Sequence, residues 1–387
     1  MRTVLINHLL EPPGRVTGIT RFLFALLPAL LGLTDDQYVL VTCWSEADLP
    51  QALLHPRLRV ITRRFWKSTA LNVLMQNATL PGLMRQTGAS IEFNGNPIGG
   101  WIGSWPRILT VHDLYLKTLP KAYPLRHRLV WDLVFPLAAR SARHIVVPSS
   151  STKEDLIRAH AQTAGKIEII PEAPAFTTSA AIASAPIAGR YGLMVGNLSP
   201  NKNPSVVIEA LALLAARGLR APLLHIGRDE HDLLRTAVAR HPEIASVTSI
   251  HGVDDEMLRA AYAHAGFFIN SSLHEGFCLP VVEAQSLGAP VIASNRSALP
   301  EVAGDGALFI DPTSPTEIAD AIALIWTDAA AEADLRRRSR QNAERFSWER
   351  AAEMLANLFD EATPRKKSPR LISPDLFSAE TKESLHA

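Results

Sequence analysis

The stretch HEGFCLPVVEA, residues 274–284, places two carboxylates, Glu275 and Glu283, eight residues apart in an otherwise apolar run. Pro280 lies between them and suits the first turn of a helix, and Gly288 suits a helix end. The preceding run GFFINSS has the pattern of a buried strand. We therefore predict strand, loop and helix, with one acid in the loop and the other in the first helical turns.

Helical side chains tilt toward the helix N-terminus, so both acids could face one pocket beside that end. Loop N–H groups and the helix macrodipole favour an anion there, such as a diphosphate. The alternative is that Glu283 only complements the helix dipole and that Glu275 is solvated. Spacing alone does not decide between these two interpretations.

Short apolar runs rich in β-branched residues alternate with helical periodicity along the chain, which is typical of βαβ units and parallel sheets. The expected strands are RTVLIN, YVLVTC, LRVIT, SIEF, RILTVHD and HIVVPS in the first half, and YGLMVGN, PLLHIG, VTSIHG, GFFINSS and PVIAS in the second. A chain of 387 residues suits two domains of ordinary size. Two doubly wound α/β domains make a cleft, and ligands of such folds bind at the carboxyl ends of the strands.

A segment between the two halves is rich in Pro, Ala, Ser and Thr and has no periodicity, which predicts a linker. The expected boundaries are 1–175 for an N-terminal Rossmann-like domain, 171–190 for the linker, 188–345 for a C-terminal Rossmann-like domain, 346–363 for a helix that packs back toward the N-terminal domain, and 364–387 for a polar, mobile tail.

The composition is that of a globular protein, with 47% apolar and 20% charged residues. The net charge of +1 conceals an asymmetry, because residues 1–175 hold 19 Lys/Arg against 12 Asp/Glu (+7) and the remainder holds 20 against 26 (−6). Cys43 and Cys278 are the only cysteines, so a disulfide framework is excluded and a reducing compartment is expected. The apolar run RFLFALLPALLGL is too short to span a bilayer and lacks the flanks of a secretory signal, which predicts a cytoplasmic protein.

The stretch HEGFCLPVVEA, with LGAPVIASNRSALPEVAGDGALFIDP after it, resembles the donor-binding region of the retaining glycosyltransferases of family 4. Four other stretches resemble the family in the same order: GRVTGITRFLFALL, TVHDLYLKTLP, IVVPSSSTKEDL and VGNLSPNKNPSVVIEAL. The likeness covers roughly residues 1–360. It implies the GT-B architecture, in which two Rossmann-like domains face a cleft, with the acceptor side in the N-terminal domain and the nucleotide sugar in the C-terminal one.

The resemblance implies roles for residues of the C-terminal half. Glu275 would contact the hydroxyls of the donor sugar, Glu283 would bind the nucleotide ribose, and Lys202 would hold the diphosphate, which gains negative charge as it leaves. The further donor-binding positions that it implies in this half are Asn197, Gly276, Phe277, Cys278 and Leu279.

In the N-terminal half, the resemblance places His112 against the transferred sugar and Gly18, at a helix start, where backbone can approach the β-phosphate. His112, Lys202 and Glu275 are therefore the candidate catalytic residues. Each position has a structural alternative: a lysine after a strand is commonly solvated, His112 could belong to a turn, and Gly18 could merely end a loop.

The chain also departs from the family pattern. A second basic residue is common near the diphosphate lysine, but asparagine occupies the two corresponding positions, Asn197 and Asn201. Cys278 stands where glycine is common, which could narrow the pocket. The acidic pair at 254–255, in VDDEML, could suggest a metal site, but we interpret it as the acidic start of a helix.

The implied reaction is transfer of a hexosyl unit from a nucleoside diphosphate sugar to a hydroxyl, with retention at the anomeric carbon. No enzymic nucleophile is evident beside the expected anomeric position, so departure and attack on the same face are favoured. No cofactor, metal or nucleic acid is expected. The pattern is most similar to bacterial mannosyltransferases of exopolysaccharide or lipopolysaccharide assembly, which favours GDP-mannose, while UDP-glucose, UDP-N-acetylglucosamine and deoxysugar donors stay open.

The acceptor is expected to be a saccharide or a polyprenyl-diphosphate-linked oligosaccharide. Residues 121–144 interleave Lys, Arg and His with Trp and Phe at near-helical spacing. Such a helix could lie on an anionic membrane, here the inner face of the cytoplasmic membrane, and meet a lipid-linked acceptor. The alternative is a basic outer face on a packed helix.

Two functions of other classes stay open on the sequence. A related two-domain fold serves epimerases that cleave nucleotide sugars, and turnover of donor without acceptor would reveal one. A non-catalytic subunit that binds donor is the other, favoured by the missing second basic residue and disfavoured by the presence of Lys202, Glu275 and Glu283 together.

Overall fold

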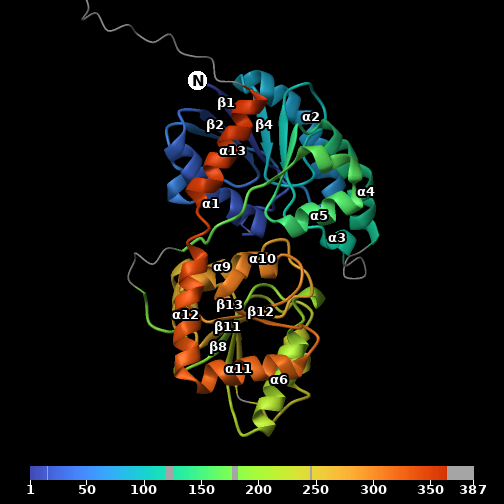
Figure 1. Ribbon diagram of the computed structural model, residues 1–387. Coiled ribbons are helices and arrows are strands. Elements are labelled where there is room, and N and C mark those ends of the chain that lie inside the picture. The colour runs from blue at the N-terminus through green and yellow to red at the C-terminus, as the bar shows by residue number, and fades with distance from the viewer. Residues whose placement is uncertain (15, 119–124, 177–181, 245, 364–387) are drawn as a thin grey trace, which may run out of the picture.

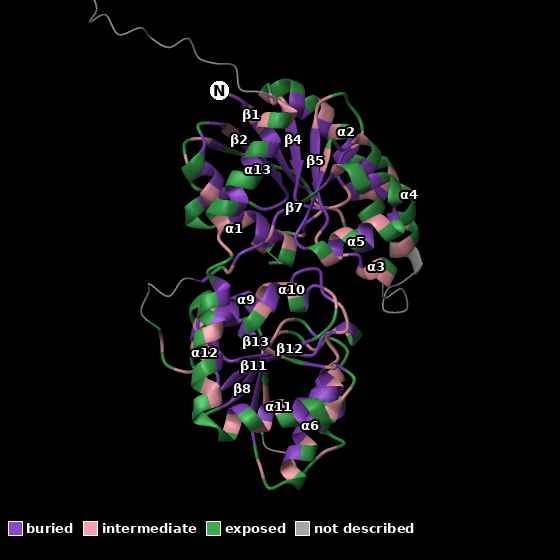
Figure 2. Ribbon diagram, viewed as in Figure 1, coloured by how far each residue is buried: buried purple, intermediate pink, exposed green. Residues whose placement is uncertain are grey.

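The computed structural model describes all residues except 15, 119–124, 177–181, 245 and 364–387. Two parallel sheets form two lobes, and helices flank each sheet (Figure 1). The strands of both sheets are largely buried, whereas the flanking helices alternate buried and exposed residues (Figure 2). Each lobe therefore has the layered core of an α/β domain.

The sheet of the N-terminal lobe has the order β3-β2-β1-β4-β5-β6-β7, and every pairing is parallel. Its strands are β1 (Thr3–His8), β2 (Gln37–Thr42), β3 (Leu58–Thr62), β4 (Ile91–Asn94), β5 (Arg107–Thr110), β6 (His144–Val147) and β7 (Ile167–Ile169). The helices between them are α1 (Gly18–Leu33), η1 (Glu46–Asp48), η2 (Gln51–Leu53), α2 (Thr69–Thr87), α3 (Tyr115–Thr118), α4 (Leu125–Ser141), α5 (Ser150–Ala159) and η4 (Ala161–Lys166).

The sheet of the C-terminal lobe has the order β10-β9-β8-β11-β12-β13 and is also parallel. Its strands are β8 (Gly192–Val195), β9 (Leu223–Ile226), β10 (Val247–Ile250), β11 (Phe267–Asn270), β12 (Val291–Ser294) and β13 (Ala307–Ile310). The helices are η5 (Pro200–Lys202), α6 (Pro204–Ala216), α7 (Leu233–Val238), α8 (Asp255–Ala263), α9 (Leu279–Ser286), α10 (Leu299–Ala303), η6 (Gly304–Gly306), α11 (Pro315–Thr327) and α12 (Ala329–Ala343). Strand order reverses between β8 and β11, which opens a crevice at their carboxyl ends.

Caps and prolines set the helix ends near the site. Thr17 caps the start of α1 with its hydroxyl oxygen. Asp254 Oδ1 accepts a hydrogen bond from the Met257 N–H at 2.8 Å at the start of α8, so VDDEML begins a helix as predicted. Pro280 lies in the first turn of α9, and Gly288, with φ 75°, follows its end, both as predicted.

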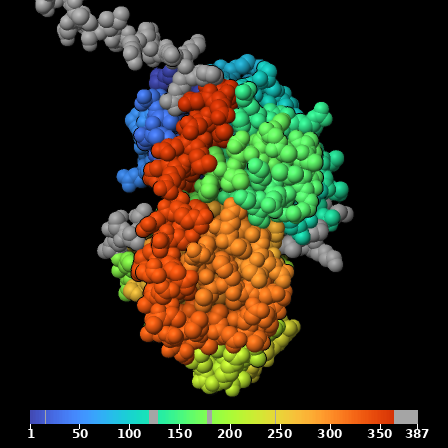
Figure 3. All heavy atoms as spheres, in the orientation of Figure 1, coloured from blue at the N-terminus to red at the C-terminus, as the bar shows by residue number. Residues whose placement is uncertain are grey.

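The last described helix, α13 (Trp348–Ala362), lies on the N-terminal lobe although α12 before it lies on the C-terminal lobe (Figures 1 and 3). Ala352, Leu355 and Phe359 of α13 belong to the same buried apolar cluster as Leu23 and Leu27 of α1. The polypeptide therefore crosses between the lobes twice, and the second crossing is fixed by burial of apolar side chains.

The predicted α/β fold of two doubly wound parallel sheets is confirmed. All the predicted strands are present, and two edge strands, β7 and β13, were not predicted. β7 has three residues, too few for a clear periodic signal. Within the described residues, no helix is both long and apolar enough to cross a membrane. The predicted mobile tail lies outside the described residues.

Helix α4 covers most of the basic and aromatic segment, of which residues 121–124 are not described. The indole of Trp131 and the ring of Phe135 are buried and stack with centroids 4.6 Å apart, so they belong to the core. These two aromatic side chains therefore do not lie on the surface of the helix, and its contact with a membrane stays a prediction. Among its described residues, the exposed large apolar side chains are Leu129, Leu133 and Leu137, at four-residue spacing on the outer side of the helix, and Asp132 and Arg140 are also exposed.

Candidate active site

A cavity of 730 Å³ lies between the two lobes. Its walls come from loops that follow β1, β5 and β7 in one lobe and β8 to β11 in the other, so it sits at the carboxyl ends of both sheets. Every predicted site residue lines it: Gly18, His112, Asn197, Lys202, Glu275, Gly276, Phe277, Cys278, Leu279 and Glu283. The structure thus brings these residues together, and their individual roles stay predictions.

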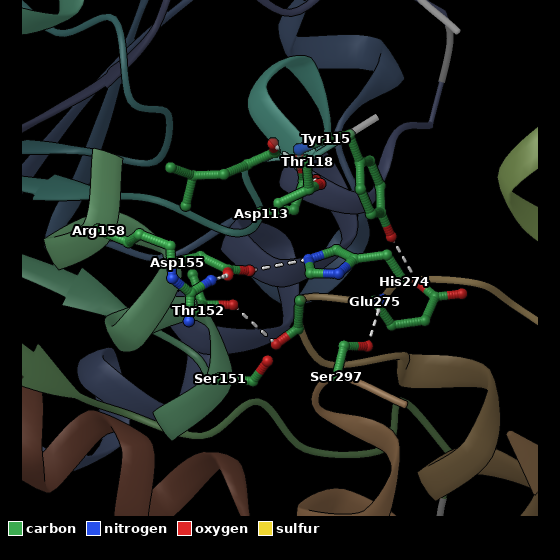
Figure 4. Close-up of polar contacts among 12 residues, drawn as sticks. Asp113, Tyr115, Thr118, Ser151, Thr152, Asp155, Arg158, His274, Glu275 and Ser297 are labelled. Atoms are coloured by element: carbon green, nitrogen blue, oxygen red, sulfur yellow. Dashed lines mark hydrogen bonds and ion pairs between the residues drawn. The ribbon is translucent and has the colours of Figure 1, made fainter. Parts of the chain in front are cut away.

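Glu275 lies in the loop between β11 and α9 and is 3% exposed. Its Oε1 accepts hydrogen bonds from Lys202 Nζ at 2.5 Å and from Ser272 Oγ at 2.6 Å. Its Oε2 accepts from the Tyr115 hydroxyl at 2.5 Å, which reaches across from the N-terminal lobe (Figure 4). Burial raises the pKa of Glu275, but the Lys202 charge and these hydrogen bonds outweigh it, so the pKa lies below its ordinary value.

Lys202 ends the short helix η5, in the loop that follows β8. Burial lowers its pKa, but the adjacent Glu275 charge raises it, with a net value of about 12. The ammonium group is therefore charged at neutral pH. The alternative of a fully solvated lysine does not hold, because the side chain is 23% exposed and its ammonium group is bonded to a buried carboxylate.

Glu283 lies in α9 and is 2% exposed. Its Oε2 accepts a hydrogen bond from the Tyr262 hydroxyl at 2.9 Å, and its Oε1 accepts one from Arg21 Nη1 at 3.2 Å. Arg21 comes from α1 of the other lobe and also lies 3.4 Å from Asp255. Burial raises the pKa of Glu283 in spite of the arginine. The carboxylate predicted to bind ribose is thus already part of a contact between the lobes.

The loop from Gly276 to Leu279 joins Glu275 to α9. A Cβ at Gly276 would overlap the carbonyl oxygen of His112, so only glycine allows this approach of the lobes. Cys278 has φ 81°, in the left-handed region that glycine adopts at low cost. Its thiol accepts a hydrogen bond from Asn270 at 3.2 Å. Burial raises the pKa of the thiol, which disfavours the reactive thiolate form.

His112 follows β5 and faces the cavity, but both of its ring nitrogens are engaged. Nδ1 lies 2.8 Å from Glu172 Oε1, and Nε2 lies 3.0 Å from the Gly95 carbonyl oxygen. Both partners are acceptors, which favours the doubly protonated ring. Burial lowers the pKa of His112, and the bond to Glu172 more than offsets it, so the net pKa is raised. His112 therefore offers the cavity no free ring nitrogen, and its two acceptor partners favour the protonated ring.

Two further predicted positions, Gly18 and Asn197, line the cavity from opposite lobes. Gly18 is the first residue of α1, and a Cβ there would meet open space, so the local backbone does not require glycine. Asn197 Oδ1 accepts a hydrogen bond from the Arg228 N–H at 3.0 Å. Asn201 Nδ2 donates to the His274 carbonyl oxygen at 2.7 Å, which ties the lysine loop to the loop after β11.

The N-terminal lobe also holds the loop after β11 directly. Ser149 Oγ and Thr152 Oγ1 donate hydrogen bonds to the Gly276 carbonyl oxygen at 2.6 and 3.0 Å. His274 Nε2 lies 2.9 Å from Asp155 Oδ2 on α5 (Figure 4). The two lobes therefore meet through the segment that carries the predicted donor-binding acids.

Several residues that shape the site were not predicted from the sequence. Tyr115 and Arg21 bond the two acids from the opposite lobe, and Arg228 lines the cavity after β9. Asp113 lines it beside His112, and burial raises the pKa of its carboxyl group. Arg21 and Tyr115 lie within the stretches GRVTGITRFLFALL and TVHDLYLKTLP, so the stretches were found but not these contacts. Within the described part of the chain, no cluster of three His, Cys, Asp or Glu residues suited to a metal ion occurs.

Comparison with known proteins gives two family matches that divide the chain. The model described as "Glycosyltransferase Family 4" matches residues 16–173, and the model described as "Glycosyl transferases group 1" matches residues 186–346. A curated relative, the O-antigen chain mannosyltransferase B of Escherichia coli, is 29% identical over 264 residues, which are 65% of this chain and 69% of that protein.

Solved structures share the fold over almost the whole chain. Sucrose-phosphate synthase from Thermosynechococcus elongatus gives a TM-score of 0.76 at 19% identity and covers 93% of this chain and 99% of its own. HepE from Anabaena, solved in complex with UDP-glucose, gives 0.72 at 18% identity and covers 93% and 100%. Together with the matches to both halves, this shows that the chain belongs to the glycosyltransferases of family 4, the retaining enzymes of GT-B architecture.

Proposed function

We propose that this glycosyltransferase moves a mannosyl unit from GDP-mannose to a hydroxyl of a saccharide or lipid-linked oligosaccharide in exopolysaccharide or lipopolysaccharide biosynthesis. The observation that carries the proposal is the Lys202–Glu275 pair, buried beside the switch point between β8 and β11 and facing the other lobe. Mannose is favoured by the likeness to the Escherichia coli mannosyltransferase. UDP-glucose is the first competitor, because HepE was solved with it.

The pair offers opposite charges to the two parts of the donor that react. Lys202 would neutralise the phosphate oxygen that leaves, and Glu275 would accept hydrogen bonds from the hexose hydroxyls. Among the described residues, Oε2 of Glu275 has Tyr115 as its hydrogen-bond partner, which leaves a lone pair for a sugar hydroxyl. The carboxylate would also favour the positive charge that grows at the anomeric carbon in the transition state.

The proposed step breaks the bond between the anomeric carbon and the phosphate oxygen while the acceptor oxygen attacks from the same face. The acceptor proton passes to the leaving phosphate oxygen, so no enzymic base is needed. His112, which favours the protonated state, would add positive charge at the sugar side. Glu283 would bind the ribose, and for this a ribose hydroxyl must share the carboxylate with Arg21 or displace it.

Thermal-shift measurements with GDP, UDP, ADP, GDP-mannose and UDP-glucose test the donor. A ligand at 100 times its dissociation constant stabilises the folded protein by about 2.7 kcal/mol, and we expect the guanosine compounds to do so. Lys202→Met should lose the shift, whereas Lys67→Met, an exposed lysine outside the cavity, should keep it. A shift with uridine compounds alone would replace GDP-mannose as the donor, and no shift with any nucleotide would contradict the function.

Product analysis separates the remaining classes. With donor and a mannose-containing acceptor, the product should carry an α-linked sugar, because the donor linkage is α and the transfer retains it. Rapid consumption of donor without acceptor would favour an epimerase or hydrolase. Nucleotide binding without turnover of any donor would favour a non-catalytic subunit.

The outer face of α4 supports contact with a membrane that carries the acceptor. Leu129, Leu133 and Leu137 are 52%, 72% and 46% exposed, and Arg140 is exposed on the same helix. An apolar stripe beside basic residues suits the interface of an anionic bilayer, where the leucines bury and the arginines meet phosphate groups. We therefore propose that the acceptor is lipid-linked and that the enzyme works at the inner face of the cytoplasmic membrane.

Co-sedimentation with vesicles tests this contact. Wild type should bind vesicles with anionic lipid more strongly than neutral ones, and salt should weaken binding, because charges are screened beyond about 8 Å at physiological ionic strength. Leu133→Asp should reduce binding, and Leu324→Asp, an exposed leucine of the C-terminal lobe, should not. Equal binding of both variants and wild type would assign α4 no role at the membrane.

A further inference from the structure

Three cationic side chains of Lys or Arg line the described part of the cavity: Arg21, Lys202 and Arg228. Two of them are bonded to buried carboxylates, since Lys202 lies 2.5 Å from Glu275 and Arg21 lies 3.2 Å from Glu283. Arg228 differs. Its guanidinium lies 3.6 Å from the carboxylate of Glu230, and both side chains are 54% exposed. A pair of this kind is weak and easily exchanged for another anion.

The backbone of Arg228 is held firmly although its side chain is free to move. Its N–H donates to Asn197 Oδ1 at 3.0 Å, and its carbonyl oxygen accepts from the Leu198 N–H at 2.8 Å. Gly227 has φ 154°, and a Cβ there would overlap the Gly196 carbonyl oxygen. The loops after β8 and β9 therefore form one platform, and Arg228 stands on it at the cavity wall.

The other cationic side chains of the cavity are paired with carboxylates, His112 with Glu172 among them, so without Arg228 a diphosphate would meet little unpaired positive charge. The diphosphate of a sugar nucleotide carries two negative charges, and it gains more as the sugar leaves. The positive charge of Lys202 is largely matched by Glu275, so the buried pair contributes little net charge. The neighbouring Asn197 is neutral, and its side-chain oxygen accepts a hydrogen bond from the backbone of Arg228.

We propose that Arg228, held by Asn197, binds the diphosphate of the donor as the second cation beside Lys202. This inference rests on the proposed function, because it assigns a ligand to part of the same cavity. On donor binding, the guanidinium exchanges Glu230 for phosphate oxygens, to which its planar fork can donate two parallel hydrogen bonds.

Calorimetry with GDP, UDP and inorganic pyrophosphate tests the proposal. A charge-assisted hydrogen bond is worth enough that Arg228→Gln should weaken GDP binding by about 10-fold or more. The affinity of the variant for UDP should fall by the same factor, because GDP and UDP share the diphosphate. Its affinity for pyrophosphate, which has no base, should fall too. Arg228→Lys should fall between wild type and Arg228→Gln, because it keeps the charge but not the fork.

A variant that moves the positive charge from position 228 to position 197 makes the test specific. Asn197→Arg combined with Arg228→Gln should recover part of the lost GDP affinity, because it returns a positive charge to the same wall of the cavity. Arg235→Gln is the matched control, since Arg235 is 78% exposed and lies outside the cavity. Melting temperatures of all variants check folding.

Each other outcome overturns a distinct statement. Unchanged GDP affinity in folded Arg228→Gln would overturn the role of Arg228 and leave the proposed function intact. A loss for GDP that spares UDP and pyrophosphate would show that Arg228 reads the base. Absence of nucleoside diphosphate binding by the wild type would contradict the proposed function itself.

Discussion

Replacing Lys202 with methionine should destabilise the C-terminal lobe as well as impair donor binding, because it leaves a buried carboxylate without its cation. The Glu275 side chain is 4% exposed, and removing one partner of a buried ion pair costs about 3–5 kcal/mol. Lys202 is 23% exposed, and Tyr115 and Ser272 still donate to Glu275, so we expect about 2–3 kcal/mol after allowing for solvent. For a domain of this size that is a fall in Tm of about 4–12 °C.

The pH dependence of this loss has a definite sign. In the wild type, the pKa of Glu275 is lower in the folded protein than in the unfolded chain. Its contribution to the free energy of unfolding is therefore present above the unfolded pKa and is lost as pH falls through the folded pKa. In Lys202→Met, burial should raise the folded pKa above the unfolded value. In the variant, the contribution of Glu275 to stability is then fully present below its unfolded pKa and is lost as pH rises through its folded pKa. The difference in Tm between wild type and variant should therefore widen from about pH 5 to about pH 8.

A double variant separates the structural effect from the functional one. Lys202→Met with Glu275→Gln removes both charges, so most of the stability should return, because a neutral amide can stay buried with its hydroxyl donors. Donor turnover should not return, because neither the phosphate nor the sugar regains its partner. If the double variant melts as low as Lys202→Met, or if the loss in Tm is the same at both pH values, the buried unpaired charge is not its cause.

Three other perturbations address the remaining features of the site. Glu283→Gln should raise the donor KM with little change in kcat, because ribose binding is the same in ground and transition states; a fall in kcat alone would contradict this. Cys278→Gly should raise Tm, because a non-glycine residue at φ 81° costs about 1–2 kcal/mol. The greater entropy of glycine in the unfolded chain offsets part of this gain. A lower Tm would show that the thiol contact with Asn270 outweighs the strain. Donor turnover should survive EDTA, since protein cations face the diphosphate, and a loss that Mg²⁺ restores would refute that expectation.

The parts of the site that depend on local sequence could be predicted. The strand, loop and helix around Glu275 and Glu283 follow from an apolar run, a proline and a glycine, each of which acts within a few residues. Lys202 differs, because a lysine in the loop after a strand is commonly solvated, and its place in the site was implied by the family resemblance. The parallel sheets follow from the alternation of strand and helix patterns, which short-range periodicity records well.

Contacts between distant segments could not be predicted. Arg21 and Glu283 are 262 positions apart, and neither segment carries a local sign of the other. The same holds for Tyr115 and Glu275, which are 160 positions apart. Helix α4 shows a second limit, because its sequence has apolar residues on two sides and periodicity does not say which side meets the core. Only the packed fold shows that the aromatic side is buried and the leucine side exposed.

The two acids of the opening motif serve the contact between the lobes and the proposed binding of the donor at once. Tyr115 and Arg21 reach them from the N-terminal lobe, and a donor that bonds the same carboxylates must share or replace these partners. Donor binding and contact between the lobes are therefore linked, and the linkage is reciprocal. If the donor changes the free energy of contact between the lobes, that contact changes the free energy of donor binding by the same amount. Gly276 lets the lobes approach closely enough for this coupling, because any larger residue would meet the His112 carbonyl oxygen. The two acids thus occupy an apolar run because they are buried where the surfaces of the two lobes meet. In this buried position, the charge state of each carboxyl group depends strongly on its hydrogen-bonding and ionic partners.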